Sequence, residues 1–107
     1  PSSMLASISN FERQESENKA LVLGDMLELG EAAYEEHVNI VQVIKGKFDT
    51  VLLVGPEFMK AASWSGFNVF RNTDEAAAWL KENPMIGKDI LIKGSRGIAL
   101  ENLINLL

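Results

Sequence analysis

Apolar residues recur along this chain in two patterns, one with the period of a helix and one in short continuous runs. Met4, Ile8 and Phe11 share one helical face, which predicts an N-terminal helix capped by Ser2 or Ser3. The continuous runs are four or five residues long and end close to a glycine, as is typical of strands buried on both faces of a sheet. They predict strands at residues 20–23, 50–54 and 89–92, with a weaker one at 68–70.

Helical periodicity returns between the predicted strands. One helix is expected over residues 31–45 and a shorter one over 57–63. Thr73 is the expected N-cap of a third helix, which ends near Pro84 because the residue before a proline avoids the helical region. A last helix is expected from Gly97 to the C-terminus. The buried stripe of the 31–45 helix is Ala33, His37, Ile40, Val41 and Ile44, and that of the last helix is Leu100, Leu103, Ile104 and Leu107.

The alternation of short apolar strands with helices determines the expected fold class. Consecutive parallel strands need crossover connections, and right-handed crossovers place helices on both faces of the sheet. We therefore predict a three-layer, Rossmann-like α/β domain with a mainly parallel sheet. In such a sheet ligands gather at the carboxyl ends of the strands, so the residues just after each strand are the informative ones.

Composition narrows the class of protein further. A length of 107 residues suits one domain with a single core. The net charge of −5 argues against a nucleic-acid surface, which needs clustered lysine and arginine. No apolar run reaches the roughly 20 residues of a membrane span. The absence of cysteine excludes disulfides and thiolate chemistry and suits a cytoplasmic protein. Because the sequence opens on Pro1, we expect it to be a piece of a longer chain.

The run "IKGSRGIALENL" carries the strongest candidate site. Lys93, Ser95 and Arg96 alternate with glycines between a predicted strand and a predicted helix. Free backbone N–H groups at a helix start, with added cations, can bind a carboxylate or a phosphate. The alternative is that Gly94 only turns the chain, Ser95 caps the helix and both cations are solvated. The residues alone do not separate these two interpretations.

Asp25 and His37 are the other candidates. Asp25 directly follows the first strand and could hold a ribose hydroxyl, a metal or an ammonium group, but a carboxylate that caps a nearby backbone N–H is the favoured alternative. His37, the single histidine, lies on an apolar stripe near the ligand edge. A histidine in that position is more often a core residue satisfied by a hydrogen bond than a catalyst.

Several known motifs fail here. "GDMLELG" lacks the glycines of a dinucleotide-binding fingerprint, and no phosphate-binding P-loop or nucleophile elbow is present. A receiver-type signalling domain needs an aspartate after its central strand, where this chain has Val54, Gly55 and Pro56.

Together, "LVLGDMLELGE" with His37 downstream and "ILIKGSRGIALE" resemble the C-terminal domain of the Mur ligase family, and "PSSM" resembles the start of that domain. The resemblance covers nearly the whole chain. It implies that residues 1–107 are the third domain of a three-domain enzyme. The member that the chain resembles most uses ATP, with Mg²⁺, to join D-alanyl-D-alanine to UDP-N-acetylmuramoyl-tripeptide, a precursor of the bacterial cell wall.

The resemblance also implies roles for the candidate residues. Asp25, Lys93, Ser95 and Arg96 become contacts to substrate or ATP, and His37 orients the loop of residues 24–30. The P-loop and the magnesium ligands belong to the central domain and the UDP-sugar site to the N-terminal one. The chain alone is therefore expected to be inactive, without a catalytic residue or a metal site of its own. The alternative is a standalone small-molecule binding or regulatory module, and an upstream coding sequence without a P-loop would favour it.

Overall fold

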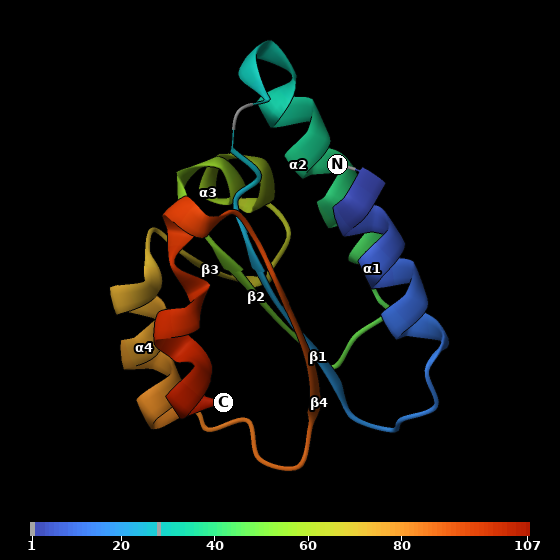
Figure 1. The fold of residues 1–107 in the computed structure, drawn as a ribbon, viewed down its shortest axis with the longest axis vertical. Helices are drawn as coiled ribbons and strands as arrows, with labels where there is room; N and C mark the ends of the chain where they lie inside the picture. Colours follow the sequence, from blue (N-terminus) through green and yellow to red (C-terminus); the bar gives the residue numbers. More distant parts are fainter. Residues whose placement is uncertain (1, 28) are drawn as a thin grey trace.

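A computed structural model describes residues 2–27 and 29–107. Pro1, part of the "PSSM" motif, lies outside the described residues. Figure 1 shows a twisted sheet between two layers of helices. Along the chain, the described elements are α1 (Ser2–Arg13), β1 (Lys19–Gly24), the 3₁₀ helix η1 (Gly30–Ala32), α2 (Ala33–Ile44), β2 (Thr50–Val54), α3 (Pro56–Ala62), β3 (Asn68–Phe70), α4 (Thr73–Glu82), β4 (Asp89–Lys93), and the 3₁₀ helices η2 (Arg96–Ile98) and η3 (Leu100–Leu106).

The sheet has the order β3-β2-β1-β4, and every pairing is parallel. This arrangement confirms the predicted fold class. β1 lies between β2 and β4, with Leu23 in register with both Leu53 and Lys93. The carboxyl ends of these three strands are therefore level at one edge of the sheet, and the segments that follow them lie side by side.

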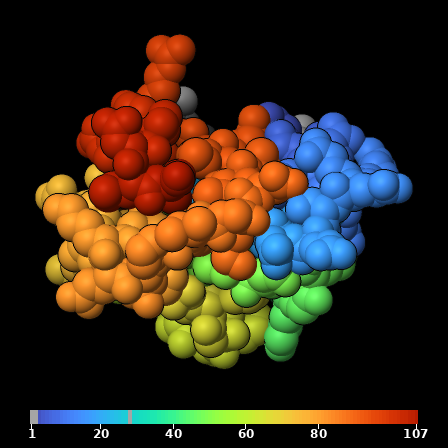
Figure 2. All heavy atoms as spheres, turned by 90° about the horizontal axis from the view of Figure 1, so that it is seen from below, coloured from blue at the N-terminus to red at the C-terminus, as the bar shows by residue number. Residues whose placement is uncertain are grey.

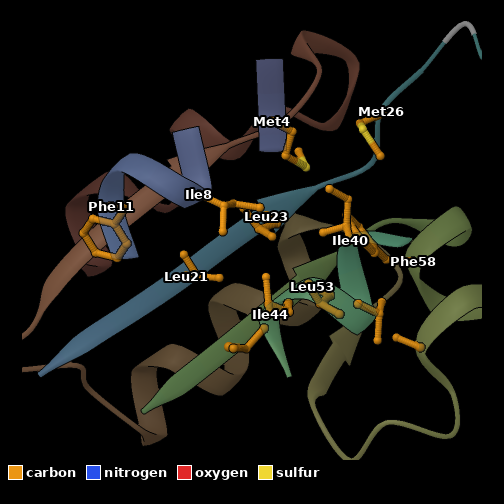
Figure 3. Close-up of a cluster of buried hydrophobic side chains, with 13 residues drawn as sticks. Met4, Ile8, Phe11, Leu21, Leu23, Met26, Ile40, Ile44, Leu53 and Phe58 are labelled. Atoms are coloured by element: carbon orange, nitrogen blue, oxygen red, sulfur yellow. The ribbon is translucent and has the colours of Figure 1, made fainter. Parts of the chain in front are cut away.

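Alternate side chains of each central strand enter two separate cores. On one face, Leu21 and Leu23 of β1 pack against α1, α2 and α3, and this larger cluster is drawn in Figure 3. On the other face, Ala20 and Val22 pack against α4 and η3. A continuous apolar run is what a strand with two buried faces requires. β1 and β2 both show this pattern, whereas β4, at the sheet edge, leaves Ile92 exposed.

The edge opposite the strand ends holds the connections that lead into the strands. Figure 2 views this edge from below and shows the segments around residues 15, 47, 65 and 86 gathered on one face. These segments lead into β1, β2, β3 and β4. The candidate residues all lie at the other edge.

Three local predictions differ from the structure. The last predicted helix is instead two 3₁₀ helices separated by Ala99, whose φ of 60° is left-handed. Leu100 and Leu103 are buried as predicted, but Ile104 is 57% exposed because a 3₁₀ helix advances three residues per turn. The N-cap of α4 is Asn72 and not Thr73, since the Asn72 side chain accepts a hydrogen bond from Glu75 N. Ser2 and Ser3 both lie inside α1.

Candidate functional site

The turns after β1 and β4 are joined directly. Asp25 N donates to Val54 O at 3.0 Å, and Ser95 N donates to Asp25 O at 3.1 Å. Leu27 N donates to the hydroxyl of Ser95 at 2.8 Å. The segment that begins at Asp25 is therefore held between the ends of β2 and β4. This geometry confirms that the turns after the first and last strands meet on a common edge.

The carboxylate of Asp25, the residue that directly follows β1, caps α3. Its two oxygens accept hydrogen bonds from Glu57 N at 2.8 Å and from Phe58 N at 2.9 Å. The first turn of a helix leaves such N–H groups without partners, and the N-cap of α3 is Gly55, which has no side chain to satisfy them. Asp25 is fully buried, so the structure shows the capping interaction that the sequence left open as an alternative.

Gly55 makes this remote cap sterically feasible. Its φ of 128° and ψ of 159° belong to a backbone region that glycine alone adopts without strain. A Cβ at this position would lie 2.5 Å from both carboxylate oxygens of Asp25. In the sequence, Gly55 is recognisable only as the end of a strand. The one signal of a further role is the pair Gly55-Pro56 at a helix start.

The side chain of His37 holds the loop after β1 in place through a hydrogen bond. Its ring is fully buried, with Nδ1 2.6 Å from Ala33 O, and Met26 N donates to Nε2 at 3.0 Å. These two bonds require the neutral tautomer that carries its proton on Nδ1. The edge-on ring of Phe58, at a centroid distance of 4.7 Å, completes the enclosure. His37 is thus a satisfied core residue that also holds the backbone of Met26.

The protonation of Asp25 stabilises the folded state toward acid pH, whereas most paired carboxylates stabilise it toward neutral pH. Burial raises the pKa of Asp25 above its ordinary value of 3.8, against the hydrogen bonds from the backbone of Glu57 and Phe58, which lower it. A raised pKa means that the folded state binds this proton more tightly than the unfolded chain does. The contribution of Asp25 to stability is therefore complete below pH 3.8 and is lost as the pH rises through the folded-state pKa.

We accordingly predict how an Asp25→Asn variant compares with the wild type. The free energy of unfolding of the wild type, minus that of the variant, should increase as the pH is lowered from 7 to 4, because asparagine does not titrate. Urea unfolding at several pH values measures this difference. A difference that shrinks toward acid pH would show that hydrogen bonding, and not burial, dominates the pKa of Asp25.

The turn of residues 93–97 carries the free cations of the site. Lys93 is half-buried and Arg96 is exposed, and within the described residues neither has an ion-pair partner. Ser95 does not cap the following helix with its side chain, contrary to one of the two interpretations, since its hydroxyl oxygen accepts from Leu27 N instead. The following helix is a three-residue 3₁₀ turn, so the expected array of α-helical N–H groups is not formed here.

Two hollows flank this turn. One, of about 230 Å³, lies between the start of α1, the loop after β1 and the turn. The other, of about 430 Å³, lies between the turn, the edge of β4 and η3. Lys93, Gly94 and Ser95 line both hollows, whereas Arg96 lines only the larger one. The turn therefore forms a ridge from which cationic and hydroxyl groups can reach ligands on either side.

The described part of the chain has no group of three or more His, Cys, Asp or Glu side chains placed to hold a metal ion. Among residues 2–27 and 29–107, the side chains therefore form no magnesium site. Among the same residues, no helix is both long and apolar enough to cross a bilayer.

Fold and edge together define an α/β domain with a cationic turn at the carboxyl edge of its sheet, and comparison with known proteins gives its family. The family described as "Mur ligase, glutamate ligase domain" matches residues 1–96. The chain belongs to the Mur ligase family, as its C-terminal domain.

The relatives narrow this assignment. The chain is 36% identical to UDP-N-acetylmuramoyl-tripeptide–D-alanyl-D-alanine ligase of Treponema pallidum, an alignment covering all of this chain and 25% of the relative. The Bacillus subtilis enzyme of the same name is 35% identical over 97% of the chain and 25% of its own length. The chain thus spans about a quarter of the length of these relatives.

Solved structures agree on the fold. A crystal structure of MurF from Acinetobacter baumannii superposes with a TM-score of 0.82 at 28% identity, covering 98% of this chain and 24% of that one. MurF ligase from Thermotoga maritima, in complex with ADP, gives a TM-score of 0.80 at 23% identity over 99% of this chain and 25% of that one.

Proposed function

We propose that this chain is the C-terminal domain of a three-domain, ATP-dependent cytoplasmic ligase that joins D-alanyl-D-alanine to UDP-N-acetylmuramoyl-tripeptide. Support comes from the shared name of relatives that align with the whole of this chain but extend about four times its length. The observation that carries the proposal is the meeting of the two family-like segments at one edge, where Lys93 and Arg96 stand without ion-pair partners among the described residues.

The proposed chemistry needs such an edge. ATP carries phosphates, the dipeptide carries a carboxylate, and its amine must be held against an activated carboxyl group. Positioning two reactants in the right orientation lowers the activation barrier by several kcal/mol, and by roughly 7–11 kcal/mol in the best cases. Lys93, Ser95 and Arg96 hold the dipeptide carboxylate or a phosphate in this proposal. The MurF ligase of Thermotoga maritima was solved in complex with ADP, which supports nucleotide use by the whole enzyme.

His37 and Asp25 contribute differently in this proposal. His37 orients the loop after β1 through Met26 N. Direct contact of Asp25 with nucleotide or ammonium stays a prediction. Its two hydrogen bonds to α3 support a positioning role in addition, because they fix the backbone to which Ser95 is attached. Magnesium, for which the described residues form no site, is assigned to the rest of the enzyme. The isolated chain is proposed to be inactive for that reason.

The test uses the full-length enzyme that contains this sequence. Dipeptide-dependent ADP release should require the full chain and should be absent with residues 1–107 alone. Lys93→Ala or Arg96→Ala should lower kcat/KM by roughly 10- to 100-fold, since a hydrogen bond to a charged group contributes about 1.5–3 kcal/mol. Lys81→Ala, at the exposed end of α4, is the matched control and should leave kcat/KM unchanged. Unaltered kinetics in both site variants would remove these cations from the mechanism.

A further inference from the structure

The C-terminal segment, residues 96–107, has a backbone that does not match the pattern of its sequence. Four apolar residues repeat at the i, i+3, i+4 and i+7 spacing of one α-helical face: Leu100, Leu103, Ile104 and Leu107. The structure instead has the 3₁₀ helices η2 and η3 there, drawn in red beside α4 in Figure 1. A 3₁₀ helix rarely exceeds three or four residues, whereas η3 has seven.

Ala99 divides this segment because it adopts a conformation that an alanine side chain disfavours. Its φ of 60° and ψ of 44° are left-handed, and elsewhere in residues 2–27 and 29–107 only glycines have a positive φ. In this conformation the Cβ lies too close to the following carbonyl oxygen, and alanine has no polar side chain with which to compensate. Strain of this kind is typical of switch regions, where a backbone changes between two arrangements.

An α-helical backbone would turn a different side chain toward the sheet. In the structure, Leu100 and Leu103 are buried and Leu106 is half-buried, as expected for three residues per turn. Ile104 is 57% exposed. With 3.6 residues per turn, Ile104 would take the place of Leu106 on the buried face. Because one leucine is exchanged for one isoleucine, the buried apolar area differs little between the two forms, and the α-helical form relieves the strain at Ala99.

The larger hollow beside the 93–97 turn has room for this change. Its volume is about 430 Å³, and Ile104 of η3 and Ile92 of β4 both line it. Among the described strands β4 pairs only with β1, so that its outer side is open and Ile92 is 36% exposed. Ile90, two residues earlier on the same face of β4, already packs against the core beneath η3. Ile104 therefore has an apolar surface to move onto.

We infer that residues 96–107 form a two-state strap over the outer part of β4. The structure shows the open state, in which Ala99 is left-handed and the larger hollow is accessible. In the closed state Ala99 is right-handed, residues 97–107 form one α-helix, and Ile104 packs on Ile92 and fills the hollow. Arg96 lines the same hollow at the start of the strap, so closure removes the open side from which a ligand reaches this cation.

Methyl NMR of the full-length enzyme, labelled at the δ1 methyl groups of isoleucine, tests the strap without any substrate present. Relaxation dispersion detects exchange between two states on the μs–ms timescale. The Ile104 methyl group should show dispersion in the wild type. Ala99→Gly should shift the ratio of open to closed molecules at least about fivefold toward the open state and suppress the dispersion, because glycine adopts a positive φ without strain.

Ala99→Val tests the opposite direction. Valine is branched at Cβ and tolerates a positive φ less well than alanine does, so the Ile104 resonance should move toward that of the closed state. Ala78→Gly is the matched control, since it makes the glycine substitution at an exposed position inside the right-handed helix α4. It should lower stability and leave the Ile104 signal unchanged.

Three results would overturn the two-state strap. The first is an Ile104 methyl group that shows no dispersion in the wild type and does not shift in Ala99→Val. The second is dispersion that is the same in Ala99→Gly as in the wild type, and the third is an equal effect of Ala78→Gly. If Ala99→Val does not fold, the absence of dispersion in the wild type alone decides against the strap. Because no substrate enters the measurement, its outcome is independent of the proposed function.

Discussion

Replacing Gly55 by alanine should lower the free energy of unfolding of this chain by about 3–6 kcal/mol. Part of this loss is backbone strain, about 1–3 kcal/mol for a residue with a side chain at a φ of 128°. The rest comes from Asp25, whose carboxylate would collide with the new methyl group. A hydrogen bond to a charged group contributes about 1.5–3 kcal/mol, and displacement of the carboxylate would weaken both bonds to α3.

Urea unfolding of Gly55→Ala against Gly46→Ala separates strain from collision. Gly46 also has a positive φ, 77°, but a Cβ there has no neighbour within 4 Å. The control should lose only about 1 kcal/mol, as expected for alanine in a left-handed conformation. Equal losses in the two variants would mean that the contact between Gly55 and Asp25 has no energetic importance.

Gly94→Ala should cause the second largest loss of stability, because the new methyl group would collide with the backbone of Gly24. A Cβ on Gly94 would lie 2.7 Å from the Cα of Gly24 and 2.9 Å from its nitrogen. The two turns can relieve this overlap only by moving apart, at a cost of about 3 kcal/mol, the upper end of the usual range for overpacking. Separation would also break the bonds of Ser95 to Asp25 and Leu27. We therefore expect the full-length enzyme to lose activity together with stability.

Gly97→Ala provides the comparison within the same turn. Its Cβ would also be crowded, at 2.7 Å from a methyl carbon of Leu27, but this neighbour is the end of a flexible side chain that can rotate away. Thermal unfolding and steady-state kinetics of the two variants should show a large effect for Gly94→Ala and a small one for Gly97→Ala. The reverse order would contradict the close approach of the β1 and β4 ends as the basis of the site.

The strands could be predicted from sequence because each is a local pattern. The strands at residues 50–54 and 68–70 were predicted with the observed bounds. The predicted bounds of β1 differ from the observed ones by one residue at both ends, and those of β4 by one residue at one end. The break in the last helix could not be predicted, because nothing in the sequence marks Ala99 for a left-handed conformation. This one residue divides the segment into two 3₁₀ helices. The predicted N-cap Thr73 was wrong by one residue because asparagine and threonine are both good caps, and only the hydrogen bond from Glu75 N identifies Asn72 as the cap.

The site was predictable in part. Placing Asp25, Lys93, Ser95 and Arg96 at one edge followed from the rule that parallel strands end together. The hydrogen-bond partners of these residues could not be predicted, because a hydrogen bond between residues 32 or 68 positions apart leaves no periodic signal in the sequence. The position of Met4 and Met26 beside the smaller hollow was not predicted for a related reason, since an apolar residue in a core and one in the wall of a hollow look alike in sequence.

The central place of β1 in the sheet has a consequence for how the polypeptide reaches its native state. β1 pairs with β2 some 30 residues later and with β4 some 70 residues later. Pairings so distant in sequence form slowly, because a long loop must close before any contact compensates for its lost entropy. During synthesis from the ribosome, one flank of this strand stays open until nearly the whole domain has emerged. While this domain is being translated, the nascent chain therefore exposes an unpaired edge of an apolar strand for most of that time, which makes it a candidate for chaperone capture.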